Sequence, residues 1–84
     1  MASGYTYVLA EAASEYVFRL PAAEQVRLVR VLRLLADSPH RTGDYTTEDQ
    51  DGRTLQNLLI DDWVITFWAD HAVKELRVTE LVQV

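Results

Sequence analysis

An acid, a histidine and a lysine lie close together in the stretch FWADHAVKELRV at residues 67–78. Asp70 and His71 are residue types that serve as general acids and bases, and Lys74 adds a positive charge nearby. The residues around them alternate as in a β-strand, so the side chains at 70 and 71 are expected on opposite sides. An aspartate at a strand end also accepts hydrogen bonds from the backbone amides of a turn. The pattern therefore favours a hairpin tip, with the Asp70 carboxylate bonded to local amides, over a catalytic pair.

The rest of the sequence lacks the residue patterns of common catalytic and metal sites. It contains no cysteine, and its two histidines have no third ligand at metal-binding spacing. It also contains no glycine-rich phosphate loop and no nucleophile elbow. Asp49, Asp51 and Gly52 resemble a fragment of a calcium loop, but the further spaced ligands and the closing glutamate are missing. We therefore expect no cofactor and no metal.

Length and composition predict one soluble globular domain over residues 1–84. The chain is 49% hydrophobic and 25% charged, and it has no run of about 18 apolar residues that a membrane span would need. Its start has no basic segment ahead of an apolar stretch, so we expect a cytoplasmic protein without membrane association. The formal net charge of -5 argues against strong nucleic-acid binding, because proteins that grip phosphate backbones usually carry a basic face.

The hydrophobic pattern predicts six elements in the order β-α-α-β-β-β. Pro21 must separate the two helices, and Pro39 stops the second one. Residues 38–52 are polar and rich in turn formers, so they predict a long loop. Asp61 and Asp62 supply a tight turn between two strands. The predicted elements are a strand at 5–10, a helix ending near residue 20, a helix at 21–37, and strands at 53–60, 63–69 and 73–82.

This order of elements belongs to the α+β class. We expect a helical hairpin packed on one face of a four-stranded, largely antiparallel sheet, with the last three strands forming a meander. Apolar residues on one side of the second helix and on alternate positions of the strands define the expected core. These core residues are Leu28, Leu32, Leu35, Ile65, Phe67 and Val78.

The outer side of the second helix combines charge with apolar residues. On a helical wheel Arg27, Arg30 and Arg33 lie opposite the core face, as on a solvated surface. Val26 and Leu34 lie among them, where an isolated soluble helix would carry polar residues. We therefore predict that these five residues form a docking face for an acidic amphipathic segment of a protein partner. A second copy of the same chain, giving a homodimer, is the rival occupant.

Nearly the whole chain resembles the RelE/ParE superfamily of small bacterial toxins from type II toxin-antitoxin systems. The similarity runs through FRLPAAEQVRLVRVLRLLADSPHRTGDY and DGRTLQNLLIDDWVITFWADHAVKELRVTEL. Four landmarks occur in the order expected for the family, and this order carries the resemblance. They are the Leu20-Pro21 break between the helices, the helix ending at 35–39, the strand start at Asp51-Gly52-Arg53, and the Asp70 turn. The resemblance implies the fold described above and an antitoxin partner.

The resemblance also implies where an RNA-cleaving site would lie, and there the sequence departs from the family. The ribonuclease branch cuts messenger RNA in the ribosome with basic residues on the sheet that hold phosphate and stabilise growing charge. Trp63-Val64 stands where the family usually has Tyr-Arg, and residues 80–84 offer no counterpart of its C-terminal Arg and Tyr. Efficient ribonuclease activity is therefore not expected. The candidate catalytic residues that remain are Arg53, which loosely matches a basic sheet position, and His71, Lys74 and Arg77.

Three functions are consistent with the sequence. The first is a RelE/ParE-like interaction module of a toxin-antitoxin system that works through protein binding. The second is a gyrase-inhibiting toxin of the ParE kind, which also needs no catalytic residues. The third is a ribosome-dependent endoribonuclease, which the acidic composition disfavours because the protein would be repelled by ribosomal RNA.

Overall fold

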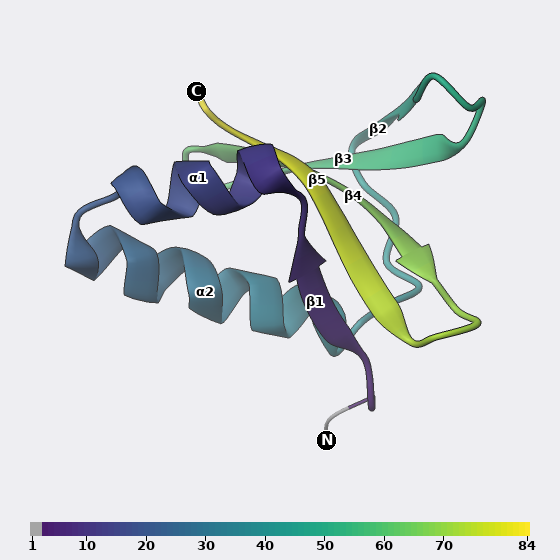
Figure 1. Ribbon diagram of the computed structural model, residues 1–84, viewed down its shortest axis with the longest axis horizontal. Coiled ribbons are helices and arrows are strands. Elements are labelled where there is room, and N and C mark those ends of the chain that lie inside the picture. The colour runs from purple at the N-terminus through teal and green to yellow at the C-terminus, as the bar shows by residue number, and fades with distance from the viewer. Residues whose placement is uncertain (1–2) are drawn as a thin grey trace.

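The computed structural model describes residues 3–84, and the chain runs through one strand, two helices and four further strands (Figure 1). The α+β class and the predicted helical hairpin are confirmed. The elements are β1 Thr6–Leu9, α1 Glu11–Arg19, α2 Ala22–Ala36, β2 Tyr45–Glu48, β3 Thr54–Ile60, β4 Trp63–Asp70 and β5 Glu75–Gln83.

The break between the helices comes from two extended residues, Leu20 and Pro21. Pro21 precedes α2 with φ at -56°, a value that the proline ring imposes and that suits the start of a helix. The side-chain amide of Gln25 donates hydrogen bonds to the carbonyls of Val17 at 3.0 Å and Leu20 at 3.1 Å. The Leu20 carbonyl at the end of α1 thereby gains a partner, while the Val17 carbonyl also accepts the Leu20 amide at 3.1 Å.

The five strands form one mixed sheet in the order β1-β5-β4-β3-β2. The predicted meander is confirmed, because β3, β4 and β5 pair antiparallel in sequence order. The predicted strand count of four is wrong, and β1 pairs parallel with β5. In Figure 1 the first and last strands lie side by side, and α1 and α2 form the connection that leads from β1 to β2.

The extra strand, β2, forms inside the segment that the sequence predicted as a loop. It pairs antiparallel with β3, and all four of its residues are exposed. Side chains from outside the strand reinforce this pairing. The Asp44 carboxylate accepts a hydrogen bond from the Leu59 amide at 2.7 Å, and the Asn57 side chain donates to the Thr47 hydroxyl at 3.1 Å. Contacts distant in sequence therefore stabilise a strand too short for a clear alternating pattern.

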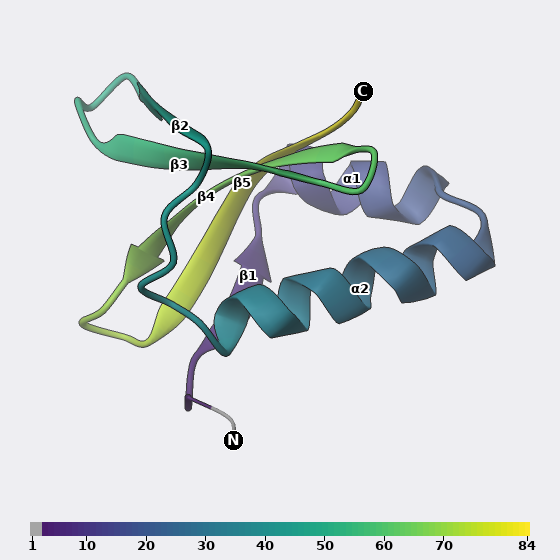
Figure 2. The same ribbon diagram turned by 180° about the vertical axis from the view of Figure 1, so that it is seen from behind.

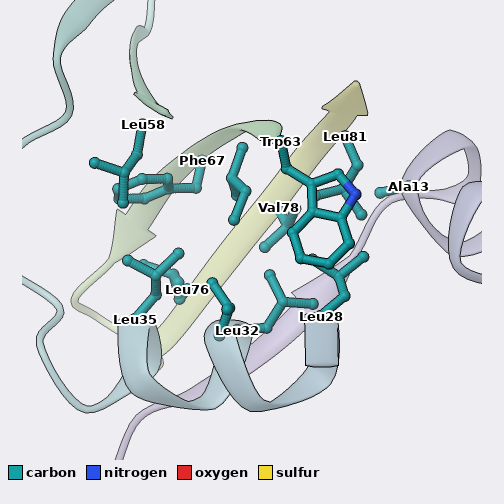
Figure 3. Close-up of a cluster of buried hydrophobic side chains, with 12 residues drawn as sticks. Ala13, Leu28, Leu32, Leu35, Leu58, Trp63, Phe67, Leu76, Val78 and Leu81 are labelled. Carbon is teal, nitrogen blue, oxygen red and sulfur yellow. The ribbon is translucent and has the colours of Figure 1, made fainter. Parts of the chain in front are cut away.

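Both helices cover the same face of the sheet, and the core lies between the helices and the sheet (Figures 1 and 2). All six residues predicted for the core are buried, together with Trp63, Leu76 and Leu81 (Figure 3). Residues three apart on a regular strand lie on opposite faces, yet Val78 and Leu81 of β5 are both buried in this core. The register between β4 and β5 shifts at Thr66/Phe67, which turns the later part of β5 over. Within residues 3–84 no helix covers the opposite face of the sheet, which we call the open sheet face.

Candidate functional site

A groove runs along the outer side of α2. Val26 is 60% exposed and Leu34 is 63% exposed, as the wheel predicted. They line the groove with Val29, Arg30 and Arg33, because residues three or four apart on a helix share one side. We call this surface the α2 groove. Gln25 and Asp37 complete its lining.

Within residues 3–84 Arg30 and Arg33 form no ion pair, in contrast to Arg27, which the wheel placed on the same stripe. Arg27 turns toward the sheet, where its guanidinium lies 4.2 Å from the centroid of the Trp63 ring. It donates hydrogen bonds to Glu24 at 2.6 Å, to Asp61 at 3.1 Å and to Asp62 at 3.2 Å. Its charge is therefore already compensated, and Arg27 does not line the groove.

The same contacts shift two pKa values. The hydrogen bond with Glu24 is the main cause that raises the pKa of Arg27. The pKa of Asp62 is lowered, chiefly because the side-chain amide of Gln83 donates to its carboxylate at 2.8 Å, and Arg27 adds to the effect. Asp62 thus links the turn between β3 and β4 to α2 and to the end of β5.

The stretch at 67–78 forms a hairpin, as predicted, but the role predicted for Asp70 is wrong. Asp70 is still the last residue of β4 and pairs with Glu75. Its carboxylate lies 3.7 Å from the Nε of Arg77, and it accepts no backbone amide hydrogen bond among residues 3–84. Because Asp70 remains in the strand, its side chain lies on the sheet face and not over the turn. Residues 71–74 make the turn, with Lys74 in the left-handed region at φ 54°.

His71 has two partners that the sequence did not reveal. The Tyr5 hydroxyl lies 2.6 Å from its Nδ1, and the His40 ring stacks on the His71 ring with centroids 4.8 Å apart. The three residues come from the N-terminal segment, the connection after α2, and the β4–β5 turn. No sequence spacing could have found this cluster, because only the fold brings those segments together (Figure 2).

The four candidate catalytic residues do not form one site. Arg53 and His71 line the same cleft, and the guanidinium of Arg53 lies 3.9 Å from the centroid of the Trp68 ring. Arg77 also lies near Trp68, at 5.8 Å, but it pairs with Glu75 at 2.7 Å. Lys74 is in the exposed turn.

The segment Asp49–Gly52, which resembles part of a calcium loop, forms the turn before β3, and Asp49 stabilises it. One carboxylate oxygen of Asp49 accepts hydrogen bonds from the amides of Asp51 and Arg53, both at 2.9 Å. Its other oxygen lies 3.3 Å from the guanidinium of Arg53. No group of three or more His, Asp or Glu residues that could hold a metal ion is found in the part of the chain that the structure describes.

The open sheet face carries a hollow between β2, β3, β4 and β5. Val64, where the family resemblance would place an arginine, lines it together with Glu80 and Val82, and no lysine, arginine or histidine lines it. Two polar residues at its floor are buried, and the Thr66 hydroxyl donates to the Asn57 side chain at 2.7 Å. The remaining lining residues are Tyr45, Thr47, Glu48, Leu55 and Val84. This hollow therefore offers carboxylates and apolar surface, and no cationic group.

Comparison with known proteins supports the fold. No protein-family model matches the sequence, and no curated protein matches it. Among solved structures, the chain is similar to a chain in the crystal structure of the archaeal RelE-RelB complex from Pyrococcus horikoshii OT3, with a TM-score of 0.66 and 16% identity. The match covers 94% of this chain and 93% of that chain. The protein therefore has a RelE-like fold. No helix among residues 3–84 has the length and apolar character needed to cross a membrane.

Proposed function

We propose that this chain is a RelE-like toxin-type protein of a toxin-antitoxin system, and that it acts by binding proteins without cleaving RNA. The observation that carries the proposal is the hollow on the open sheet face, which is lined by Glu48 and Glu80 and by no cationic side chain. Metal-independent RNA cleavage needs donors that stabilise the charge growing on phosphate, and losing one such donor typically costs about 10²- to 10³-fold in rate. Carboxylates at that place would instead repel the RNA backbone.

The α2 groove is the proposed docking site for the antitoxin. A partner with apolar side chains would cover Val26 and Leu34, and its carboxylates would meet Arg30 and Arg33. Arg27 contributes little, because three carboxylates of this chain already surround it. A homodimer across the same groove is the weaker alternative. A two-fold contact places the same patch on both copies, so the arginines of the two chains would face one another.

The proposal is tested by expressing the chain in a bacterial host while growth, messenger RNA integrity and plasmid supercoiling are followed together. A protein-binding toxin arrests growth with intact messenger RNA, and changed supercoiling would identify the gyrase-directed kind. An interaction module without toxicity leaves all three unchanged. Cleaved messenger RNA that disappears when Arg53 and His71 are replaced by Gln and Ala would overturn the proposal in favour of the endoribonuclease alternative.

A further inference from the structure

The cleft beside the β4–β5 turn differs in charge from the rest of this acidic protein. The chain has 13 Asp and Glu residues and only 8 Lys and Arg residues, yet no Asp or Glu lines the cleft. Its lining includes two arginines and two histidines, namely Arg41, Arg53, His40 and His71. We call it the cationic cleft. It lies apart from the α2 groove and from the hollow on the open sheet face, with which it shares no lining residue.

Contacts between the connection after α2 and β3 hold the walls of the cationic cleft in place, and they leave the Arg41 guanidinium without a partner among residues 3–84. The connection after α2 is anchored to β3, because the Gly43 amide donates to the side chain of Gln56 at 2.8 Å. Gly43 packs directly against the backbone of Asn57, where any Cβ atom would collide. This close approach holds the neighbouring residues His40 and Arg41 over the ends of β3 and β4. Among residues 3–84 the Arg41 guanidinium forms no hydrogen bond or ion pair.

The other groups are positioned by ring contacts. The guanidinium of Arg53 lies 3.9 Å from the centroid of the Trp68 ring, a cation–π contact that holds the group at the cleft without using its N–H donors. Its ion pair with Asp49 is long, at 3.3 Å, and Asp49 also accepts two backbone amides. When the Tyr5 hydroxyl donates to Nδ1 of a neutral His71, the ring proton lies on Nε2, which becomes a donor.

We propose that the cationic cleft binds a phosphate group. Guanidinium groups make strong, paired hydrogen bonds to phosphate oxygens, and the hydroxyls of Thr42 and Thr54 in the same lining add neutral donors. The net charge of the chain does not prevent this, since charges more than about 8 Å away are largely screened at physiological salt. The phosphate is either free, as inorganic phosphate or a small monoester, or carried by a single nucleic-acid strand. This binding site is independent of the protein-binding function proposed above.

Phosphate binding is tested with the full chain by following the indole and imidazole signals of Trp68, His40 and His71 in NMR titrations. The test variant is Arg41→Gln with Arg53→Gln, and the control is Arg19→Gln with Arg30→Gln, which removes the same charge outside the cleft. We expect inorganic phosphate to shift these signals where chloride at equal ionic strength does not. The test variant should bind phosphate about tenfold more weakly or worse, because each lost bond is charge-assisted. The control should bind within twofold of the unmodified protein.

Two further probes distinguish free phosphate from a nucleic-acid strand as the ligand. They are a mixed-sequence single-stranded hexanucleotide with a 5′-phosphate and the same strand without that phosphate. Tighter binding of both strands than of inorganic phosphate supports a nucleic-acid backbone, and tighter binding of inorganic phosphate supports a free ligand. If the double variant unfolds, as circular dichroism would report, Arg41→Gln alone replaces it, since that side chain makes no contact that the fold needs. Absence of any shift at the cleft, or equal weakening in the test and control variants, would overturn the proposal.

Discussion

At the scale of single residues, His71 shows how a turn residue gains partners that are distant in sequence. The alternation around it predicted a hairpin tip, which the structure confirms. The stacking of His40 and the 2.6 Å contact with Tyr5 were not predictable, because only the fold brings the N-terminal segment and the connection after α2 beside the β4–β5 turn. Asp70 was assigned to the turn by residue type, but it belongs to β4 and faces Arg77.

His71→Ala should leave partner binding, and any growth effect that depends on it, essentially intact, since the proposed docking site is the α2 groove and His71 does not line it. The substitution removes one partly solvated hydrogen bond, so we expect a stability loss of about 0.5 to 1.5 kcal/mol. Thermal unfolding and the growth assay measure the two effects separately. Abolished activity with an unchanged melting temperature would show that His71 acts in chemistry.

Asp62 predicts a specific dependence of stability on pH. Its pKa is lowered in the folded protein by Gln83 and Arg27, so folding favours the ionised carboxylate. The stability that this provides is present above the unfolded pKa of about 4 and is lost as the pH falls through the lower folded value. In urea unfolding, the difference in stability between the unmodified protein and Asp62→Asn should therefore be largest at neutral pH and should shrink toward pH 3.

The matched control for this change is Asp51→Asn. Among residues 3–84 the Asp51 side chain makes no ion pair or hydrogen bond, although its backbone amide does. A difference for Asp62→Asn that stays constant from pH 7 to pH 3, like that of the control, would contradict the assignment.

At the scale of elements, α2 and β2 mark the limits of sequence-based prediction. α2 was predictable within a residue because apolar spacing, Pro21 and Pro39 all agree on its bounds. β2 was missed because its four residues lie between turn formers, and the Asn57 and Asp44 side chains that hold it act across the sheet. The α2 surface was predicted in its apolar part. Arg27 contacts Trp63 and the turn carboxylates, and a helical wheel does not include such contacts.

Two leucines on α2 test which side of the helix faces the core and which side faces solvent. Leu32 is fully buried and Leu34 is 63% exposed, so the same truncation should have very different costs. Leu32→Ala should lose about 2 to 5 kcal/mol through lost burial and the cavity left behind. Leu34→Ala should change stability by no more than about 0.5 kcal/mol. Equal losses in urea unfolding would mean that the helix is rotated from the orientation described here.

At the scale of the whole molecule, the sequence predicted the class and the hairpin but not the parallel pairing of the first strand with the last. The parallel pairing of β1 with β5 joins the two ends of the chain. Nothing in the local sequence of either strand specifies such a partner, because the paired residues, such as Thr6 and Glu75, lie far apart in the chain. The fold presents three separate surfaces: the α2 groove, the open sheet face and the cationic cleft. The fold distributes the candidate residues predicted from the sequence among these surfaces, with Val26, Arg30, Arg33 and Leu34 at the α2 groove and Arg53 and His71 at the cationic cleft.

The proposed binding of a partner along the α2 groove is tested by one binding measurement. A fluorescent, helical, acidic amphipathic peptide is titrated with the unmodified protein and with Val26→Asp, Leu34→Asp by fluorescence polarisation. Burying each apolar side chain contributes about 1.5 to 3 kcal/mol, so the double variant should bind at least tenfold more weakly while remaining folded. Leu59→Asp, Val84→Asp, which changes two exposed apolar residues elsewhere, should bind like the unmodified protein. Equal affinity of all three proteins for the peptide would contradict docking at the α2 groove.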